Sequence, residues 1–167
     1  MLRISKKGDY AVFIMGYLAT HGAAPGGGVV SAQEITDRSG LSKAVVANLL
    51  KDLAKGGLLE STRGLHGGYR LARPATDISL GRILEIVEGP FVLVDCAQDH
   101  NPAESDPAAC SLVSFCPSKR PMRVLHQRIA SILDELRLPE LVEAPAVFDA
   151  PSHANDLNAP STSATTR

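Results

Sequence analysis

The sequence predicts a mainly α-helical fold with a small β-wing, made of a winged helix-turn-helix domain and a long C-terminal helix. Three observations predict this class. Apolar residues recur at helical spacing in several segments, two short β-like runs flank a glycine-rich tip, and 167 residues with 44% hydrophobic content suffice for one domain with its own core. Aromatic residues make up only 4% and Trp is absent, which disfavours a platform for stacking bases or sugars.

Three helices are predicted before residue 56. Residues 5–21 carry large apolar side chains at helix-face spacing, and the glycines and proline of residues 22–28 end this helix. Ser31-Ala32-Gln33-Glu34 is a capping box that begins a short helix through Arg38: the Ser hydroxyl accepts from the third helical N–H and the Glu carboxylate reaches back. After a turn at Gly40, Ser42 caps a helix over residues 43–55, whose apolar side carries Val45, Val46, Leu49, Leu50 and Leu53.

A hairpin and two further helices follow. Strands are expected at residues 58–62 and 69–72 around Gly64, Gly67 and Gly68, and Pro74 ends their pairing. Ser79 caps a helix over residues 80–88, which Gly89-Pro90 ends. Beyond Pro121, a longer helix places on one stripe Met122, Leu125, Ile129, Ile132, Leu133 and Leu136.

The chain therefore divides into four parts. These are a winged helix-turn-helix region (1–90), a cysteine-bearing loop (91–120), a long helix (121–143) and a tail (144–167). The tail is rich in Ala, Pro, Ser and Thr, so it is predicted to be disordered.

The order of helix, helix, turn, helix and hairpin predicts DNA binding. The second helix of such a pair enters the major groove by its N-terminal residues, here Ser42, Lys43, Ala44, Ala47 and Asn48. At the hairpin, Arg63 and His66 are expected to reach a minor groove, and Arg70 and Arg73 to contact phosphates.

The charge distribution supports this reading of the first half. Residues 1–73 carry ten Lys and Arg against five Asp and Glu, a net of +5, whereas residues 74–167 carry seven against thirteen, a net of −6. A basic half fits a polyanionic partner. The alternative is an adaptor that binds no DNA, in which these cations are merely solvated and the hairpin is a connector.

The N-terminus loosely resembles a secretion signal, because Lys6 and Lys7 precede an apolar run over residues 11–19. The run is far shorter than the ~20 residues that span a bilayer. Asp9 also lies at its entrance. We therefore predict no membrane association and a cytoplasmic location.

The three cysteines, Cys96, Cys110 and Cys116, are spaced C-x13-C-x5-C. Three thiolates in one loop can hold a soft metal centre such as an iron–sulfur cluster or zinc, and the absence of a CxxC disfavours a structural zinc site. A fourth ligand must come from elsewhere, and the candidates are Asp9, His100, His126, Asp95, Asp99 and Asp106. Ordinary thiols or a redox-active disulfide remain the alternative.

An enzyme is a further alternative, with Cys116 as nucleophile and His126 as base. No motif supplies a group that orients the base or donors for an oxyanion, so the sequence predicts that the protein is not an enzyme.

Several motifs resemble the Rrf family of bacterial transcription regulators, the group of IscR and NsrR. They comprise Leu2-Arg3-Ile4-Ser5-Lys6 with Asp9-Tyr10-Ala11, residues 35–53, Gly57-Leu58, Arg63-Gly64, Gly67-Gly68-Tyr69, Leu71-Ala72, and residues 78–88 with Gly89-Pro90. The resemblance covers roughly residues 1–138. Within the family, the first helix and the wing are most similar to the regulators of the SUF iron–sulfur assembly system.

The resemblance implies a homodimer with paired winged helices, a dimerisation helix and an iron–sulfur cluster near the dimer interface. By position, Cys96, Cys110 and Cys116 match the family's three ligands. IscR-like members add a His after the third Cys, but here Pro117-Ser118-Lys119 follows. NsrR-like members use an Asp in the partner's first helix, and Asp9 falls at that place, with His126 as the alternative. The 2Fe-2S type is favoured, and 4Fe-4S stays open because the first two cysteines are further apart than in IscR.

Taken together, these features predict a DNA-binding repressor that reads a pseudo-palindromic operator in double-stranded DNA as a homodimer. Its cluster would sense iron–sulfur status, redox state or nitric oxide, and its targets would include iron–sulfur assembly genes. A regulator without a cluster, which senses oxidants by thiol chemistry, is the alternative.

Overall fold

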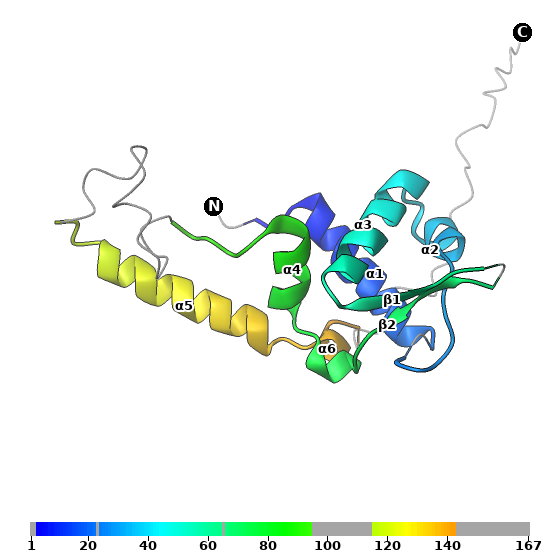
Figure 1. The fold of residues 1–167 in the computed structure, drawn as a ribbon. Coiled ribbons are helices and arrows are strands. Elements are labelled where there is room, and N and C mark those ends of the chain that lie inside the picture. Colours follow the sequence, from blue (N-terminus) through cyan, green and yellow to red (C-terminus); the bar gives the residue numbers. More distant parts are fainter. Residues whose placement is uncertain (1–2, 23, 65, 95–114, 143–167) are drawn as a thin grey trace, which may run out of the picture.

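The computed structural model describes residues 3–22, 24–64, 66–94 and 115–142. Three helices come first: α1 (Lys6–Thr20), α2 (Ala32–Ser39) and α3 (Lys43–Lys55). The antiparallel strands β1 (Leu59–Thr62) and β2 (Gly68–Leu71) follow, then a 3-10 turn η1 (Ala75–Asp77) and α4 (Leu80–Glu88). Further along the chain come α5 (Lys119–Glu135) and α6 (Leu138–Val142). The predicted class, mainly helical with a two-stranded wing, is confirmed, and α5 extends away from the body formed by the other elements (Figure 1).

Serines cap four helices: the caps at Ser31, Ser42 and Ser79 were predicted, and the cap at Ser5 was not. The hydroxyls of Ser5, Ser31, Ser42 and Ser79 accept from backbone N–H groups in the first turns of α1, α2, α3 and α4. Each such cap stabilises its helix by about 1 kcal/mol. The second half of the capping box is wrong, because the carboxylate of Glu34 accepts instead from the hydroxyl of Tyr17, at 3.0 Å.

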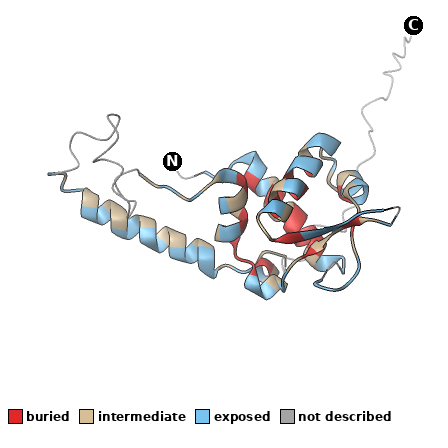
Figure 2. Cartoon of the chain, viewed as in Figure 1, coloured by how far each residue is buried: buried red, intermediate tan, exposed pale blue. Residues whose placement is uncertain are grey.

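The core lies around α1. Its Ile14, Met15 and Leu18 are fully buried against apolar residues of α2, α3, the wing and α4. Figure 2 shows the buried residues gathered in the body, whereas α5 carries only intermediate and exposed ones. The wing is attached to this core by a bridge between Tyr69 and Val30, whose backbone groups exchange bonds of 2.8 and 2.9 Å.

The last long helix differs from its predicted bounds. It begins at Lys119 instead of beyond Pro121, because a proline in the first turn removes an N–H that has no partner within the helix. It ends at Glu135 instead of continuing to 143, because Leu136 is extended. Around this break, Leu80 N–H donates to Leu136 O at 2.8 Å and Leu138 N–H donates to Ile78 O at 2.9 Å.

The break inserts Leu138 into the core of the winged helix domain, where it is fully buried, and α6 packs on α1. The core therefore draws on residues well beyond 90. The predicted disorder of residues 144–167, and the positions of Cys96, His100 and Cys110, lie outside the described residues.

Candidate DNA interface and metal centre

The outer side of α3 is polar and open to solvent. Its buried residues are Val46, Leu49, Leu50 and Leu53, so helical geometry turns the intervening positions outward. All five residues predicted to enter a major groove are exposed: Ser42, Lys43, Ala44, Ala47 and Asn48. We call them the recognition face. Lys51 is also exposed and lies one turn beyond Ala47, so the same spacing could have added it.

The wing tip presents Arg63 and His66, both exposed and without a hydrogen bond or ion pair to any described residue. The tight turn requires glycine: a Cβ on Gly67 would lie 2.4 Å from the Thr62 carbonyl oxygen, and Gly64 has a φ of +121°. The tip can therefore approach a narrow groove closely.

The two other wing arginines are engaged within the domain. Arg70 lies directly opposite Glu60 in the hairpin, and its Nε and Nη2 both contact Glu60 Oε2 at 2.9 Å. Arg73 Nη2 donates to the Gly57 carbonyl oxygen at 3.2 Å. Of the predicted wing contacts, Arg63 and His66 are the ones without such partners.

The end of α3 is held by its neighbours. Gly56, its C-cap, lies so close to Ile86 of α4 that a Cβ would be 2.5 Å from Ile86 Cδ1. Arg82 donates to the Gly56 carbonyl oxygen at 3.3 Å, and Lys7 Nζ lies 3.0 Å from Asp52 Oδ2. The orientation of the recognition face thus depends on α1 and α4.

Cys116 is a partly buried free thiol just before α5. It lines a hollow of about 510 Å³ with Lys119, Arg120, Arg123 and Val124, and Arg123 Nε is buried without a partner among the described residues. A centre held by three thiolates and a carboxylate is anionic, and three cations at one of the thiolates suit it. The thiol of Cys116 and the cations around it are chemically compatible with such a cluster.

Asp9 is exposed in the first turn of α1. In Figure 1 the start of α5 lies at the outer end of that helix, away from the body that contains α1. The described residues hold no group of three or more His, Cys, Asp and Glu side chains arranged for a metal, and Cys96 and Cys110 lie outside them.

His126, the alternative ligand, is already engaged. Its ring stacks on Phe91 at 5.2 Å, and its Nδ1 accepts a long bond of 3.5 Å from the Leu93 N–H. Coordination through Nε2 would place the ring proton on Nδ1 and lose this bond. Coordination by His126 would therefore cost an existing contact, whereas Asp9 is exposed.

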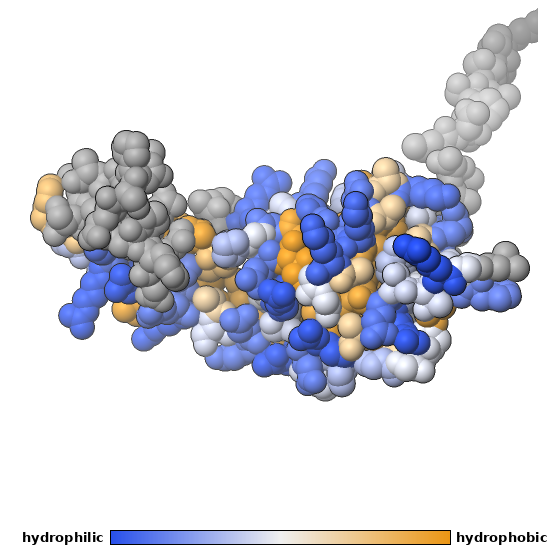
Figure 3. Space-filling model, in the orientation of Figure 1, coloured by the Kyte–Doolittle hydropathy of each residue, from blue (hydrophilic) through white to orange (hydrophobic). Residues whose placement is uncertain are grey.

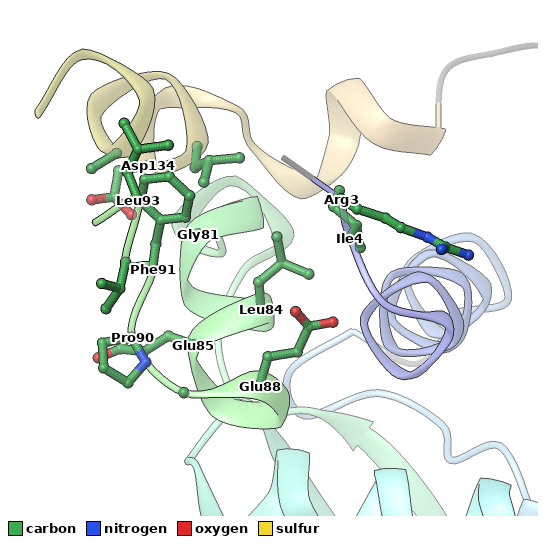
Figure 4. A pocket seen from close by; sticks show the side chains of 14 residues that line it. Arg3, Ile4, Gly81, Leu84, Glu85, Glu88, Pro90, Phe91, Leu93 and Asp134 are labelled. Carbon is green, nitrogen blue, oxygen red and sulfur yellow. The ribbon is translucent and has the colours of Figure 1, made fainter. Parts of the chain in front are cut away.

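The structure contains a pocket that the sequence analysis did not predict, lined by residues from four segments. A pocket of about 630 Å³ lies between the start of the chain, α4, residues 89–93 and α5 (Figure 4). Its carboxylates are Glu85, Glu88 and Asp134, above apolar side chains such as Leu84 and Leu133. These segments are distant in sequence, so no local motif predicts the pocket.

An open, lysine-bearing helix face beside a two-stranded wing defines a winged helix-turn-helix DNA-binding protein. The chain belongs to the Rrf2 family, described as iron-dependent transcriptional regulators, which matches residues 4–144. The resemblance found in the sequence is thereby confirmed.

Relatives and solved structures agree with this assignment. The HTH-type transcriptional regulator IscR of Vibrio atlanticus is 32% identical over 148 residues, 89% of this chain and 79% of that protein. The structure of T. potens IscR is 32% identical, with a TM-score of 0.61, and covers 84% of this chain and 86% of its own. That of CymR, the global cysteine regulator of B. subtilis, is 30% identical, with a TM-score of 0.63 and coverages of 85% and 97%.

These proteins are transcription regulators, so the prediction that the chain is not an enzyme is confirmed and the nucleophile hypothesis for Cys116 is wrong. Membership of a DNA-binding family likewise favours DNA binding over the adaptor. Among the described residues, no helix combines the length and apolarity needed to cross a bilayer.

Proposed function

We propose that this protein is a homodimeric repressor that senses iron–sulfur status, redox state or nitric oxide through a cluster. Cys96, Cys110 and Cys116 would supply three ligands and Asp9 of the partner subunit the fourth. The cationic hollow around Cys116 carries the proposal, because Lys119, Arg120 and Arg123 offset the charge of an anionic centre. A 2Fe-2S type is favoured, and iron–sulfur assembly genes are the proposed targets.

The homodimer is supported by the surface of α5. Val124, Leu125 and Ile132 are 43%, 42% and 56% exposed, and Figure 3 shows hydrophobic patches along this helix between charged side chains. The helix starts with Lys119 and Arg120 and ends with Asp134 and Glu135. An antiparallel pair of α5 helices would cover the apolar side and place each basic start opposite an acidic end.

The partner's Asp9 would be the weakest ligand. When bound, the cluster supplies iron that reacts with oxygen and nitric oxide. A carboxylate oxygen is a poor match for a soft sulfide centre, so this bond would break first. The three cysteines would retain the centre, while Asp9 ties α1 to the other subunit only as long as it is coordinated. Release of α1 would alter DNA affinity because α1 supports α3.

On DNA, each recognition face would enter a major groove and each wing tip, with Arg63 and His66, a minor groove. The two-fold axis of the dimer would read a pseudo-palindrome with half-sites about 34 Å apart. Contacts between Lys or Arg side chains and phosphates make the affinity fall with salt.

A cluster-free thiol sensor is the second candidate. Two observations favour it: Cys116 is a free thiol, and one similar structure is an oxidised form of Staphylococcus aureus CymR, 29% identical with a TM-score of 0.59. In this case a disulfide between cysteines would replace the cluster as the sensing event.

Protein purified without oxygen tests the proposal by its visible spectrum, iron and sulfide content, and affinity for DNA. We expect a brown protein whose colour is lost in Cys96→Ala, and whose cluster decays faster in air in Asp9→Ala than in the wild type. Asp37→Ala, an exposed acid on α2, is the matched control and should leave the decay unchanged. Colourless protein with a reversible disulfide would support the thiol sensor instead.

A further inference from the structure

The first turn of α1 contacts the recognition helix through one side chain. Lys7 Nζ lies 3.0 Å from Asp52 Oδ2 on α3 and donates to the Val87 carbonyl oxygen of α4 at 2.8 Å. Asp9 is two residues further along the same turn and is exposed. A displacement at Asp9 therefore moves Lys7 with it, because both belong to one hydrogen-bonded turn.

The same turn is tightly seated on α4. Ser5 donates to Glu88 through its backbone N–H and its hydroxyl, and Gly8 packs against Leu84 and Glu88 so closely that a Cβ would overlap Glu88. Figure 4 shows Glu88 beside the start of α1. The start of α1 and the end of α4 thus form one support.

The last turns of α3 rest on this support at two places. Ile86 and Arg82 of α4 hold Gly56, and Lys7 of α1 holds Asp52, one turn earlier. The contact from α1 is an ion pair at the surface, with side-chain exposures of 48% for Lys7 and 39% for Asp52. It can therefore break and reform without disturbing the core.

We infer that Lys7 is a positioning residue that transmits the state of Asp9 to the recognition helix. This inference rests on the proposed function. While Asp9 is tied to the partner subunit, the first turn of α1 is fixed in one position and Lys7 holds Asp52 accordingly. When Asp9 is released, the start of α1 shifts together with the end of α4, so Lys7 keeps the Val87 carbonyl oxygen but changes its contact with Asp52 of α3. A change in the contact between Lys7 and Asp52 therefore changes the orientation of the recognition face and the affinity for the operator.

Lys7→Met tests this, with Lys6→Met as the matched control. Lys6 lies in the same turn, carries the same charge and makes no hydrogen bond or ion pair to a described residue. The probe is duplex DNA selected from random sequences by the wild-type protein. Affinity is measured for the cluster-loaded and the apo form of each variant, and the readout is the ratio of the two dissociation constants. Hydrogen exchange of residues 52–57 in both forms gives a second readout that needs no DNA.

In Lys7→Met we expect the dissociation constants of the cluster-loaded and apo forms to differ by roughly three- to fivefold less than in the wild type. This is the range that one exposed ion pair can supply. The exchange difference at residues 52–57 should also vanish. Lys6→Met should weaken both forms equally and keep the wild-type ratio. Asp52→Asn, which removes the same contact from the other side, should repeat the Lys7→Met result and guards against a folding defect in one variant.

A wild-type ratio in both Lys7→Met and Asp52→Asn would overturn the inference alone. A wild-type protein that holds no iron, or whose two forms bind the probe equally, would overturn the proposed function and this inference with it. The spectrum and the wild-type ratio separate the two failures, because both are measured before any variant is compared.

Discussion

At the scale of single residues, the wing shows how one contact decides what a side chain is free to bind. Arg70 was predicted to contact phosphate, yet both of its donors contact Glu60 across the hairpin. If this part of the wing contacts DNA, the Glu60 carboxylate would repel the phosphates. We therefore expect the pair to oppose DNA binding until it opens.

Glu60→Gln should consequently raise affinity for DNA roughly threefold and make the slope of log affinity against log salt steeper by about one unit, because one more cation meets a phosphate. Fluorescence anisotropy with labelled duplex over a range of salt measures both. Asp77→Asn, an exposed acid of η1, is the control. An unchanged slope in Glu60→Gln would show that Arg70 does not contact DNA.

Tyr17 is a second residue whose environment has a measurable consequence. Burial raises the pKa of Tyr17 above its ordinary value of 10.0, and the hydrogen bond to Glu34 adds to the shift. Because the pKa of Tyr17 is raised in the folded state, the neutral phenol contributes to the free energy of unfolding. This contribution is complete below pH 10 and is lost as pH rises through the raised pKa.

Tyr17→Phe should lower the free energy of unfolding by about 1 kcal/mol at neutral pH, because Glu34 loses its donor. The difference from the wild type should narrow above pH 10. Urea titrations at a series of pH values give both quantities. A constant difference up to pH 11 would contradict the assignment of this hydrogen bond to the neutral phenol.

At the scale of elements, local signals predicted most helices and failed where tertiary contacts intervene. Ser42 and Ser79 mark helix starts by their own hydroxyls, so α3 and α4 were predicted to the residue. The end of α5 at Glu135 could not be predicted, because Leu136 continues the apolar period and the break depends on backbone bonds to residues 78–80.

Some features of the candidate site could likewise be predicted from the sequence, and others depend on tertiary contacts. The recognition face follows from helical spacing, whereas the pairing of Arg70 with Glu60 depends on the hairpin register. The contacts of His126 with Phe91 and Leu93 likewise come from the fold, and no spacing in the sequence reveals them.

The exposed apolar side of α5 makes a prediction about assembly. Ile132→Asp would place a charge in the proposed helix pair, so it should convert a dimer into monomers and weaken operator binding at least tenfold, since two half-sites are then read separately. Sedimentation velocity and anisotropy measure the two effects, and circular dichroism checks that helix content is kept. Gln127→Asp, exposed on another side of α5, should stay dimeric.

At the scale of the whole molecule, the residues that directly follow α5 are part of the core of the winged helix-turn-helix region. Leu138 follows α5 in the chain, yet it is fully buried among residues of the body, and α6 packs on α1. Leu138→Ala should therefore lower the free energy of unfolding of the body by 2–5 kcal/mol, as for other buried leucines. Thermal unfolding followed by circular dichroism measures this, and Leu125→Ala, on the exposed side of α5, should have a much smaller effect on the monomer.

The insertion of Leu138 has a consequence for building chimaeras. A fragment that ends at residue 90 would lack Leu138 and have a cavity in its core. The winged helix-turn-helix region therefore cannot be produced as an intact domain from residues 1–90 alone. Exchanging α5 between regulators of this kind would succeed only if the recipient keeps its own residues 136–142. Residues 136–142 follow α5 in the sequence but belong to the core of the winged helix-turn-helix region, so a chimaera must keep these two parts from the same protein.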